Sequence, residues 1–133
     1  MGEAQLDLLE RLDTYAATIS RDQLELDFDK WLMVSRALEL AAQACLDLAM
    51  ELVAKRAIGV PESYRDAFVR LAQAGVITES ASRSLQGWAG LRNVLAHMYT
   101  AIDFDRAFEA LTADKSVLRD FGRIAARELR SDS

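Results

Sequence analysis

Apolar side chains recur every three or four residues along most of the chain, a spacing typical of amphipathic helices. The longest predicted helix carries an apolar stripe with a seven-residue repeat, able to pack along a neighbouring helix or across a dimer. The stripe consists of Trp31, Val34, Leu38, Ala41, Cys45, Leu48 and Leu52. The predicted helices cover residues 3–19, 29–57, 63–74, 79–98 or 99, and 103–129.

Turn-forming residues are scarce and support the same fold class. Six Gly and one Pro are too few for an all-β domain, which needs a turn about every 8 to 12 residues. The acidic segment at residues 21–29 is expected to link the first two helices, with Asp27 or Asp29 as the N-cap of the second. Gly59 and Pro61 should end the long helix. The pattern therefore predicts an all-α, mainly antiparallel bundle of four to five helices.

The length and the charge distribution of the chain limit its possible functions. The 133 residues suit one domain, residues 1–133. The net charge of -5 lies wholly in residues 1–60, which hold 11 acidic and 6 basic side chains. The rest is neutral and contains nine Arg but one Lys. No global positive field attracts nucleic acid, so any RNA contact should be local and lie in the second half.

Cysteine content and the start of the chain indicate a cellular compartment. Cys45 is the single cysteine, so no intramolecular disulfide forms, and its place in the apolar stripe predicts a small buried side chain rather than a reactive thiol. Acidic residues interrupt the first leucines, unlike a signal peptide. No stretch is apolar enough to span a membrane. We expect a soluble, cytoplasmic protein.

Four polar side chains crowd the end of the fourth predicted helix: Arg92, Asn93, His97 and Tyr99. At about 100° per residue, Asn93 and His97 stack as an i, i+4 pair, while Arg92 and Tyr99 lie within about 20° of each other on a second row. Arg92 and His97 are about 140° apart. One helix therefore does not aim both at one atom, although a loosened last turn or a second subunit can close the gap.

These side chains suit attack on an RNA phosphodiester. A neutral His97 can accept the proton of a 2′-hydroxyl group. Arg92 can hold the phosphate in a forked contact and stabilise the transition state, and Asn93 can fix the tautomer of the imidazole. This chemistry needs no cofactor and no metal, and one His without a nearby Cys or second His gives weak support for a metal site.

Other interpretations of the same residues stay open. In a polar patch without chemistry, Arg92 pairs with an acid of another helix, His97 bonds a carbonyl and Tyr99 covers the core. A serine hydrolase is disfavoured, because Ser80, Ser82 and Ser84 lie thirteen or more residues from His97 at the start of the helix.

The motif and several segments on either side of it resemble a known family. The segment Gly90-Leu91-Arg92-Asn93-Val94-Leu95-Ala96-His97-Met98-Tyr99 contains Arg-x4-His-x-Tyr and resembles the signature of the HEPN superfamily, specifically of HepT-like toxins. Outside the motif, four further segments occur in the same order as in the family: Leu38-Glu39, Pro61-Glu62-Ser63-Tyr64, Ala74-Gly75-Val76-Ile77 and Ile102-Asp103. The resemblance covers about residues 5–125.

The resemblance implies a homodimer in which Arg92 of one chain works beside His97 of the other in one cleft. It implies metal-independent RNA cleavage, with Arg92 and His97 as the catalytic pair and Asn93 as a supporting neighbour. It also implies a HepT/MntA-type toxin whose partner is a minimal nucleotidyltransferase antitoxin that can transfer AMP to Tyr99. An adenylyl group there would occupy the phosphate position and pair with Arg92.

A row of arginines on the last predicted helix has two interpretations. Arg119 and Arg123 can extend the cleft as RNA contacts. Alternatively, the row Arg119, Arg123, Arg127 and Arg130 is a solvated face whose charges suit a helix C-terminus.

The leading hypothesis is an endoribonuclease toxin that is neutralised by its partner. The alternative is a non-catalytic HEPN subunit that docks a nucleotidyltransferase, and a third interpretation is a structural bundle without an active cleft. The acidic first half is unusual for an RNA-binding protein, and it fits a surface that faces a protein partner or solvent.

Overall fold

The computed structural model describes residues 3–98 and 101–130, with the backbone alone at residues 3 and 4. Its helices are α1 (Glu3–Thr18), α2 (Arg21–Leu26), α3 (Phe28–Arg56), α4 (Tyr64–Gln73), α5 (Glu79–Ala96), α6 (Phe104–Thr112) and α7 (Ser116–Arg130). The described residues contain no β-strand. The all-α bundle expected from the sequence is therefore confirmed.

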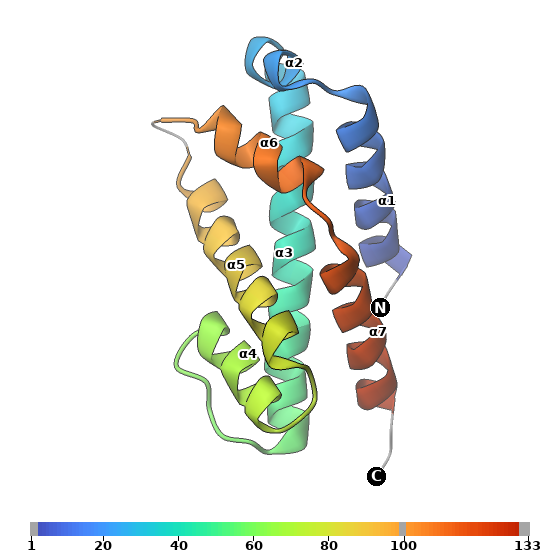
Figure 1. The fold of residues 1–133 in the computed structure, drawn as a ribbon, viewed down its shortest axis with the longest axis vertical. Helices are drawn as coiled ribbons and strands as arrows, with labels where there is room; N and C mark the ends of the chain where they lie inside the picture. Colours follow the sequence, from blue (N-terminus) through green and yellow to red (C-terminus); the bar gives the residue numbers. More distant parts are fainter. Residues whose placement is uncertain (1–2, 99–100, 131–133) are drawn as a thin grey trace.

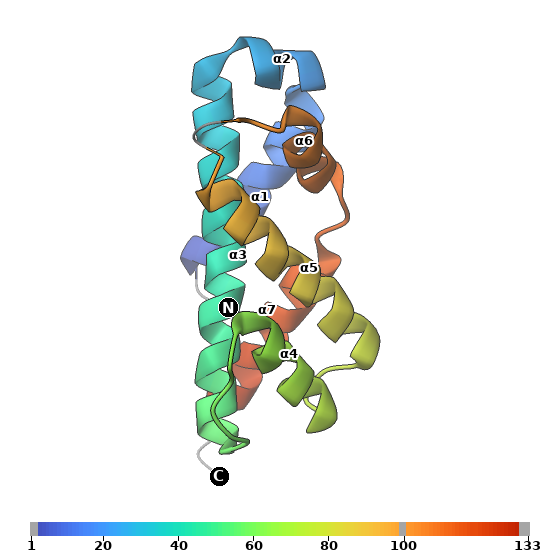
Figure 2. The ribbon, with the colours of Figure 1, turned by 90° about the vertical axis from the view of Figure 1, so that its left-hand side faces the viewer.

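Helix α3 is the axis of the bundle and packs against each of the other six helices. Figure 1 shows α1 and α7 on one side of α3 and α4 and α5 on the other, with α6 crossing obliquely near α2. In the view of Figure 2, most of the chain lies to one side of α3. One face of this helix consequently stays open along much of its length.

The apolar stripe predicted for the long helix forms the core of this single chain. Its members are buried except for Leu48, which is half-buried. Two aromatic contacts connect distant parts of the sequence: Trp31 meets Phe104 with ring centroids 5.3 Å apart, and Phe68 meets Phe121 at 5.6 Å. The stripe packs within one chain, so it is not available to pack across a dimer.

The segment predicted as a link at residues 21–29 contains the short helix α2. Ser20 and Gln23 form a reciprocal capping box, in which each side chain accepts a hydrogen bond from the backbone N–H of the other. Asp27, one of the two expected caps, begins α3 by accepting hydrogen bonds from the N–H groups of Asp29 and Lys30. These local caps stabilise a short helix in a segment whose acidic composition had predicted a link.

The helix predicted over residues 103–129 is divided into α6 and α7. Ala113 has an extended backbone (φ -67, ψ 155), and the Asp114 carboxylate accepts a hydrogen bond of 2.9 Å from Ser116 N–H, which offers the backbone an alternative to helix. The buried Lys115 ammonium donates to the carbonyls of Leu111 and Ala113. With α2, this break raises the number of described helices from the expected four to five to seven.

Candidate functional site

Helix α5 carries most of the polar motif at its C-terminal end. Thr78 caps its start by accepting a hydrogen bond of 3.0 Å from Ala81 N–H. Leu91 and Leu95 are buried and anchor the last two turns in the core. The polar side chains between and after them are therefore presented from a fixed backbone.

His97 is the C-cap of α5, and its side chain is exposed. Its Nδ1 lies 2.7 Å from the backbone oxygen of Asn93. A carbonyl oxygen only accepts hydrogen bonds, so Nδ1 carries the proton of this contact and the neutral ring keeps its lone pair on Nε2. The geometry thus orients a base at Nε2.

Asn93 holds this tautomer through its main chain. The sequence suggested that the residue would fix the imidazole, and the observed contact comes from its carbonyl group rather than from its amide side chain. The Asn93 side chain is exposed. A supporting role for that side chain stays a prediction.

Helix α5 ends at Ala96, two to three residues before the predicted end. The N–H groups of His97 and Met98 donate to the oxygens of Val94 (3.2 Å) and Leu95 (3.3 Å), three residues earlier, which is the tighter pattern of many helix ends. The α-helical row proposed to join Arg92 to residue 99 is therefore interrupted. Tyr99 itself lies outside the described residues.

Around the axis of α5, Arg92 lies about 140° from His97 and about 100° from Asn93 at standard helix geometry. Its side chain is half-buried, and its Nε atom is buried without a hydrogen-bond partner among the described residues. A buried donor without an acceptor is unusual in proteins. The polar-patch interpretation expected an acid of another helix to pair with Arg92, and the described part of the chain has no such acid. Its second expectation, a carbonyl contact of His97, is met.

The two arginines proposed as additional RNA contacts are already paired. Arg119 is in hydrogen-bonding contact with the Asp13 carboxylate of α1, and Arg123 Nη1 lies 3.0 Å from Asp120 Oδ1. Helix α7 shares a cavity with the first turns of α5, whereas the motif occupies the end of α5 (Figure 1). A role of Arg119 and Arg123 in RNA contact stays a prediction.

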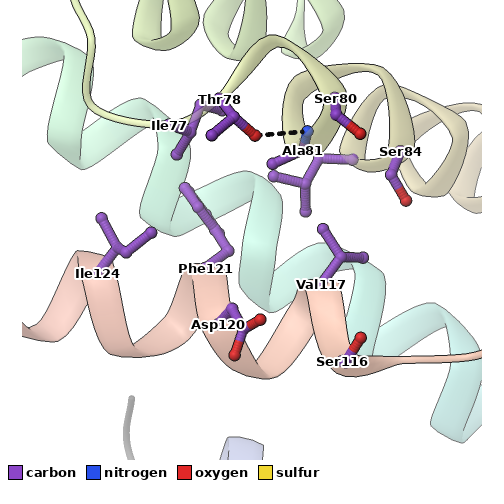
Figure 3. Close-up of a pocket in the computed structure, with 11 residues that line it drawn as sticks. Ile77, Thr78, Ser80, Ala81, Ser84, Ser116, Val117, Asp120, Phe121 and Ile124 are labelled. Atoms are coloured by element: carbon purple, nitrogen blue, oxygen red, sulfur yellow. Dashed lines mark hydrogen bonds between the residues drawn. The ribbon is translucent and has the colours of Figure 1, made fainter.

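The cavity between α5 and α7 has a volume of about 290 Å³. Figure 3 shows Ser80 and Ser84 of α5 and Ser116 of α7 around an apolar base formed by residues such as Phe121. The single His of the chain lies at the other end of α5. Among the described residues that line this cavity, none is a histidine that could activate a serine.

Ser82, the third serine of the cluster, is buried, and its hydroxyl donates a hydrogen bond of 3.0 Å to the Phe68 oxygen. It joins α5 to α4. The serine hydrolase interpretation therefore has no geometric support.

Sequence reasoning missed Arg65, which approaches the motif helix from α4. Its Nη2 atom lies 2.5 Å from the position that a Cβ atom would take at Gly90. Arg65 is 25 residues before Gly90, and no local pattern relates the two positions. The nearest sequence signal is Gly90 itself, because a helix-interior Gly without a turn often allows a close approach.

Three further properties complete the description of the site and its surroundings. Cys45 is buried, and burial raises the pKa of its thiol to about 12, in line with the predicted core role.

In residues 3–98 and 101–130, no three His, Cys, Asp or Glu side chains converge as metal ligands would. Within the same ranges, none of the helices combines the length and the apolar character needed to cross a membrane.

The fold and the site are those of a small all-α protein that carries an Arg and a His near the end of one helix. The model of the HepT-like family, described as "Ribonuclease HepT-like", matches residues 6–123 of this chain. The chain therefore belongs to the HepT-like family.

Individual relatives agree with this membership. The chain is 35% identical over 83 residues to the mRNA nuclease HepT of Shewanella oneidensis, a match covering 62% of each protein. It is 30% identical over 94 residues to the tRNA nuclease HepT of Aphanizomenon flos-aquae, covering 71% of this chain and 64% of that protein. The chain thus aligns with less than two thirds of the length of either relative.

The fold also matches a solved crystal structure of a toxin–antitoxin complex with AMP-PNP. The TM-score is 0.75 at 27% identity, and the match covers 92% of this chain and 89% of the other.

Proposed function

We propose that this chain is an endoribonuclease toxin whose reaction needs no metal. The relatives named mRNA nuclease and tRNA nuclease and the related toxin–antitoxin structure support the nuclease and toxin parts of this proposal. The observation that carries the proposal is the contact of 2.7 Å between His97 Nδ1 and the Asn93 carbonyl. This contact places the proton of the neutral imidazole on Nδ1, so Nε2 is the nitrogen that can act as a base. A polar patch without chemistry is expected to hold the same contact, and membership of the HepT-like family favours the catalytic interpretation.

The reaction begins when His97 Nε2 takes the proton of a 2′-hydroxyl group of RNA. The 2′-oxygen forms a bond to phosphorus, the bond to the 5′-oxygen breaks, and that oxygen takes up a proton from water as it leaves, while His97 returns its proton to the solvent. The products are a 2′,3′-cyclic phosphate and a 5′-hydroxyl end. Arg92 supports the reaction by binding the phosphate and the negative charge that develops on it.

The decisive variant is His97→Ala. Loss of a positioned base typically lowers a rate about 10²- to 10⁴-fold, so both RNA cleavage and growth arrest on expression should disappear while the circular dichroism spectrum stays helical. Cyclic phosphate ends, detected by mass spectrometry of the products of the unchanged protein, test the reaction course. Undiminished cleavage by His97→Ala would refute the assignment. Expression of the unchanged protein without any effect on growth would favour a non-catalytic docking subunit.

The separation of Arg92 and His97 on α5 favours a cleft shared by two copies of the chain. Arg92 has no counter-ion among the described residues, and it points away from His97 of its own chain. We propose that Arg92 of one protomer acts with His97 of its partner.

The open face of α3 supplies an apolar surface for this homodimer. Leu32, Met33, Leu40 and Met50 are each 37–49% exposed there. A second copy that covers these side chains removes apolar surface from water and brings a second motif close to the first.

Mixing two inactive variants tests the shared cleft. In a 1:1 mixture of Arg92→Ala and His97→Ala that has exchanged subunits, half of the dimers contain both chains, and each has one intact cleft. About a quarter of the original activity should therefore return. No return of activity, together with a monomeric mass by light scattering at micromolar concentration, would refute the shared cleft.

We also propose that the partner is a minimal nucleotidyltransferase antitoxin that acts on Tyr99. The toxin–antitoxin complex among the structural relatives supports such a partner, and the family resemblance supports AMP transfer. Incubation with the purified partner, ATP and Mg²⁺ should add the mass of AMP to a peptide containing Tyr99. A Tyr99→Phe variant that is still modified would refute this position.

A further inference from the structure

We propose that Arg65 of α4 binds a phosphate of the RNA strand next to the one that is cleaved. The inference rests on the proposed function, because it assigns a substrate contact beside His97. It concerns binding along the strand and gives Arg65 no part in the chemical step.

The first observation is the position of the Arg65 guanidinium over α5. The Nη2 atom occupies the space that a Cβ atom would need at Gly90, at 2.5 Å from the ideal Cβ position. Helices α4 and α5 are packed together, as both ribbon views show (Figures 1 and 2). Gly90 thus allows an arginine from α4 to lie directly on the helix that carries the motif.

The second observation is that Gly90 and His97 share one face of α5. Seven residues correspond to about 700° of rotation, so the two positions lie within about 20° of each other and about 10 Å apart along the axis. Val94 lies between them on the same face and is 40% exposed. Arg65 and His97 therefore flank the same face of α5, and positions about 10 Å apart along the axis are too far apart to bind one phosphate together.

The third observation is that Arg65 has no local partner. No described group forms a hydrogen bond or ion pair with its side chain, which is exposed. Arg65 also lies in the first turn of α4, where the positive end of the helix dipole disfavours a cation. By contrast, Arg70 in the last turn of the same helix pairs with Asp66, with 2.9 Å between Nε and Oδ2. An anion from outside the chain would satisfy Arg65.

The salt dependence of RNA binding tests this contact directly. The probe is a fluorescein-labelled single-stranded RNA of mixed sequence, and all proteins carry His97→Ala so that the probe stays intact. Adding Arg65→Ala should weaken binding roughly tenfold, as expected for loss of one charge-assisted hydrogen bond. It should also make the slope of log K against log salt about 0.7 shallower, the value for one phosphate of a single strand. Arg65→Lys should restore most of the slope but less of the affinity, because Lys cannot form the forked contact.

The matched control is Arg11→Ala. Arg11 is exposed and has no hydrogen bond or ion pair among the described residues, but it lies on α1, which packs on α3 and α6 rather than on α4 or α5. Its removal takes away the same charge and should leave the slope unchanged.

Gly90→Ala separates binding from folding. The added Cβ atom displaces the flexible tip of Arg65, so RNA binding should weaken although Arg65 is present. Ala is favoured over Gly in a helix interior by up to about 1 kcal/mol, so the variant should be at least as stable in urea. Weaker binding by a protein of equal or higher stability cannot be ascribed to unfolding.

The outcomes distinguish this inference from the proposed function. If the protein with His97 cleaves RNA but Arg65→Ala has the same slope and affinity as Arg11→Ala, the Arg65 contact is refuted and the nuclease assignment stands. If the protein with His97 neither cleaves nor binds the RNA, the proposed function fails and the Arg65 contact fails with it. In active protein, Arg65→Ala should raise KM and leave kcat within about twofold; a fall in kcat alone would also contradict a pure binding role.

Discussion

Lys115 at the junction of α6 and α7 offers a sharp test of how the bundle is held. The residue is 4% exposed, and its ammonium donates to the carbonyl oxygens of Leu111 and Ala113, the latter at 3.0 Å. Replacement by Met keeps the length of the side chain and removes the donor. The last carbonyls of α6 then lose their partner where water has little access.

The expected loss of stability follows from two opposing contributions. Hydrogen bonds from a charged donor contribute roughly 1.5–3 kcal/mol each, and burial of one ammonium costs several kcal/mol. We therefore expect Lys115→Met to lower the free energy of unfolding by about 1–3 kcal/mol. For a chain of this length, Tm should fall by roughly 3–12 °C. Urea unfolding followed by circular dichroism measures the first quantity, and thermal unfolding measures the second.

Lys55→Met is the matched control. Lys55 also donates to two backbone oxygens, those of Glu128 (2.8 Å) and Leu129 (3.1 Å), but it is exposed. Surface substitutions usually change stability by less than about 0.5 kcal/mol. Equal losses in the two variants would refute the argument from burial. A gain in stability for Lys115→Met would show that the cost of burying the charge outweighs its hydrogen bonds.

The pH dependence of the same pair of proteins gives an independent check. Burial lowers the pKa of Lys115, and the nearby Asp13 and Asp114 oppose this effect, whereas Arg119 adds to it. Because the folded pKa lies below the unfolded one, the unfolded chain binds more protons between the two values, and stability rises with pH there. The difference between the unchanged protein and Lys115→Met should therefore grow as pH increases from 7 towards the unfolded pKa of about 10.5. A difference that shrinks over this range would contradict the assignment.

Two further predictions concern the core. Cys45, whose thiol pKa is raised to about 12 by burial, should not react with a disulfide reagent at pH 8 in the folded protein and should react fully in urea; rapid reaction of the folded protein would contradict its buried position. Phe68→Ala should lower the free energy of unfolding by about 3–5 kcal/mol, because Phe68 is fully buried and packs edge-on against Phe121. A urea titration showing a loss below about 1 kcal/mol would mean that the contact between α4 and α7 is not as close as the structure indicates.

Much of the fold follows from local patterns. Residues such as Leu38, Cys45 and Leu52 repeat at helical spacing, and this periodicity correctly gave the long helix and its buried side. The exceptions are also local: Ser20 with Gln23 begins α2, and Asp114 accepts from Ser116 at the start of α7. Capping residues stand within an otherwise helical pattern, so hydrophobic spacing alone does not reveal where they interrupt it.

The candidate site, like the fold, could be predicted only in part from the sequence. The types and spacing of Arg92, Asn93 and His97 are visible in the sequence, and the family signature depends on them. The role of the Asn93 main chain and the early end of α5 are not visible, because both depend on backbone geometry at the helix terminus. The position of Arg65 over Gly90 depends on how two helices pack.

The sequence by itself determined the class of fold, the family and the chemistry available at the end of α5, because helical periodicity and residue type act over a few neighbouring positions. The tertiary structure decided which arginines already hold a carboxylate and which remain able to bind an external anion. Thus Arg119 is paired with Asp13 of α1, whereas Arg65, which lies over Gly90, has no hydrogen-bond or ion-pair partner among the described residues. Such pairings join residues far apart in the chain, and only the packing of complete helices brings them within reach.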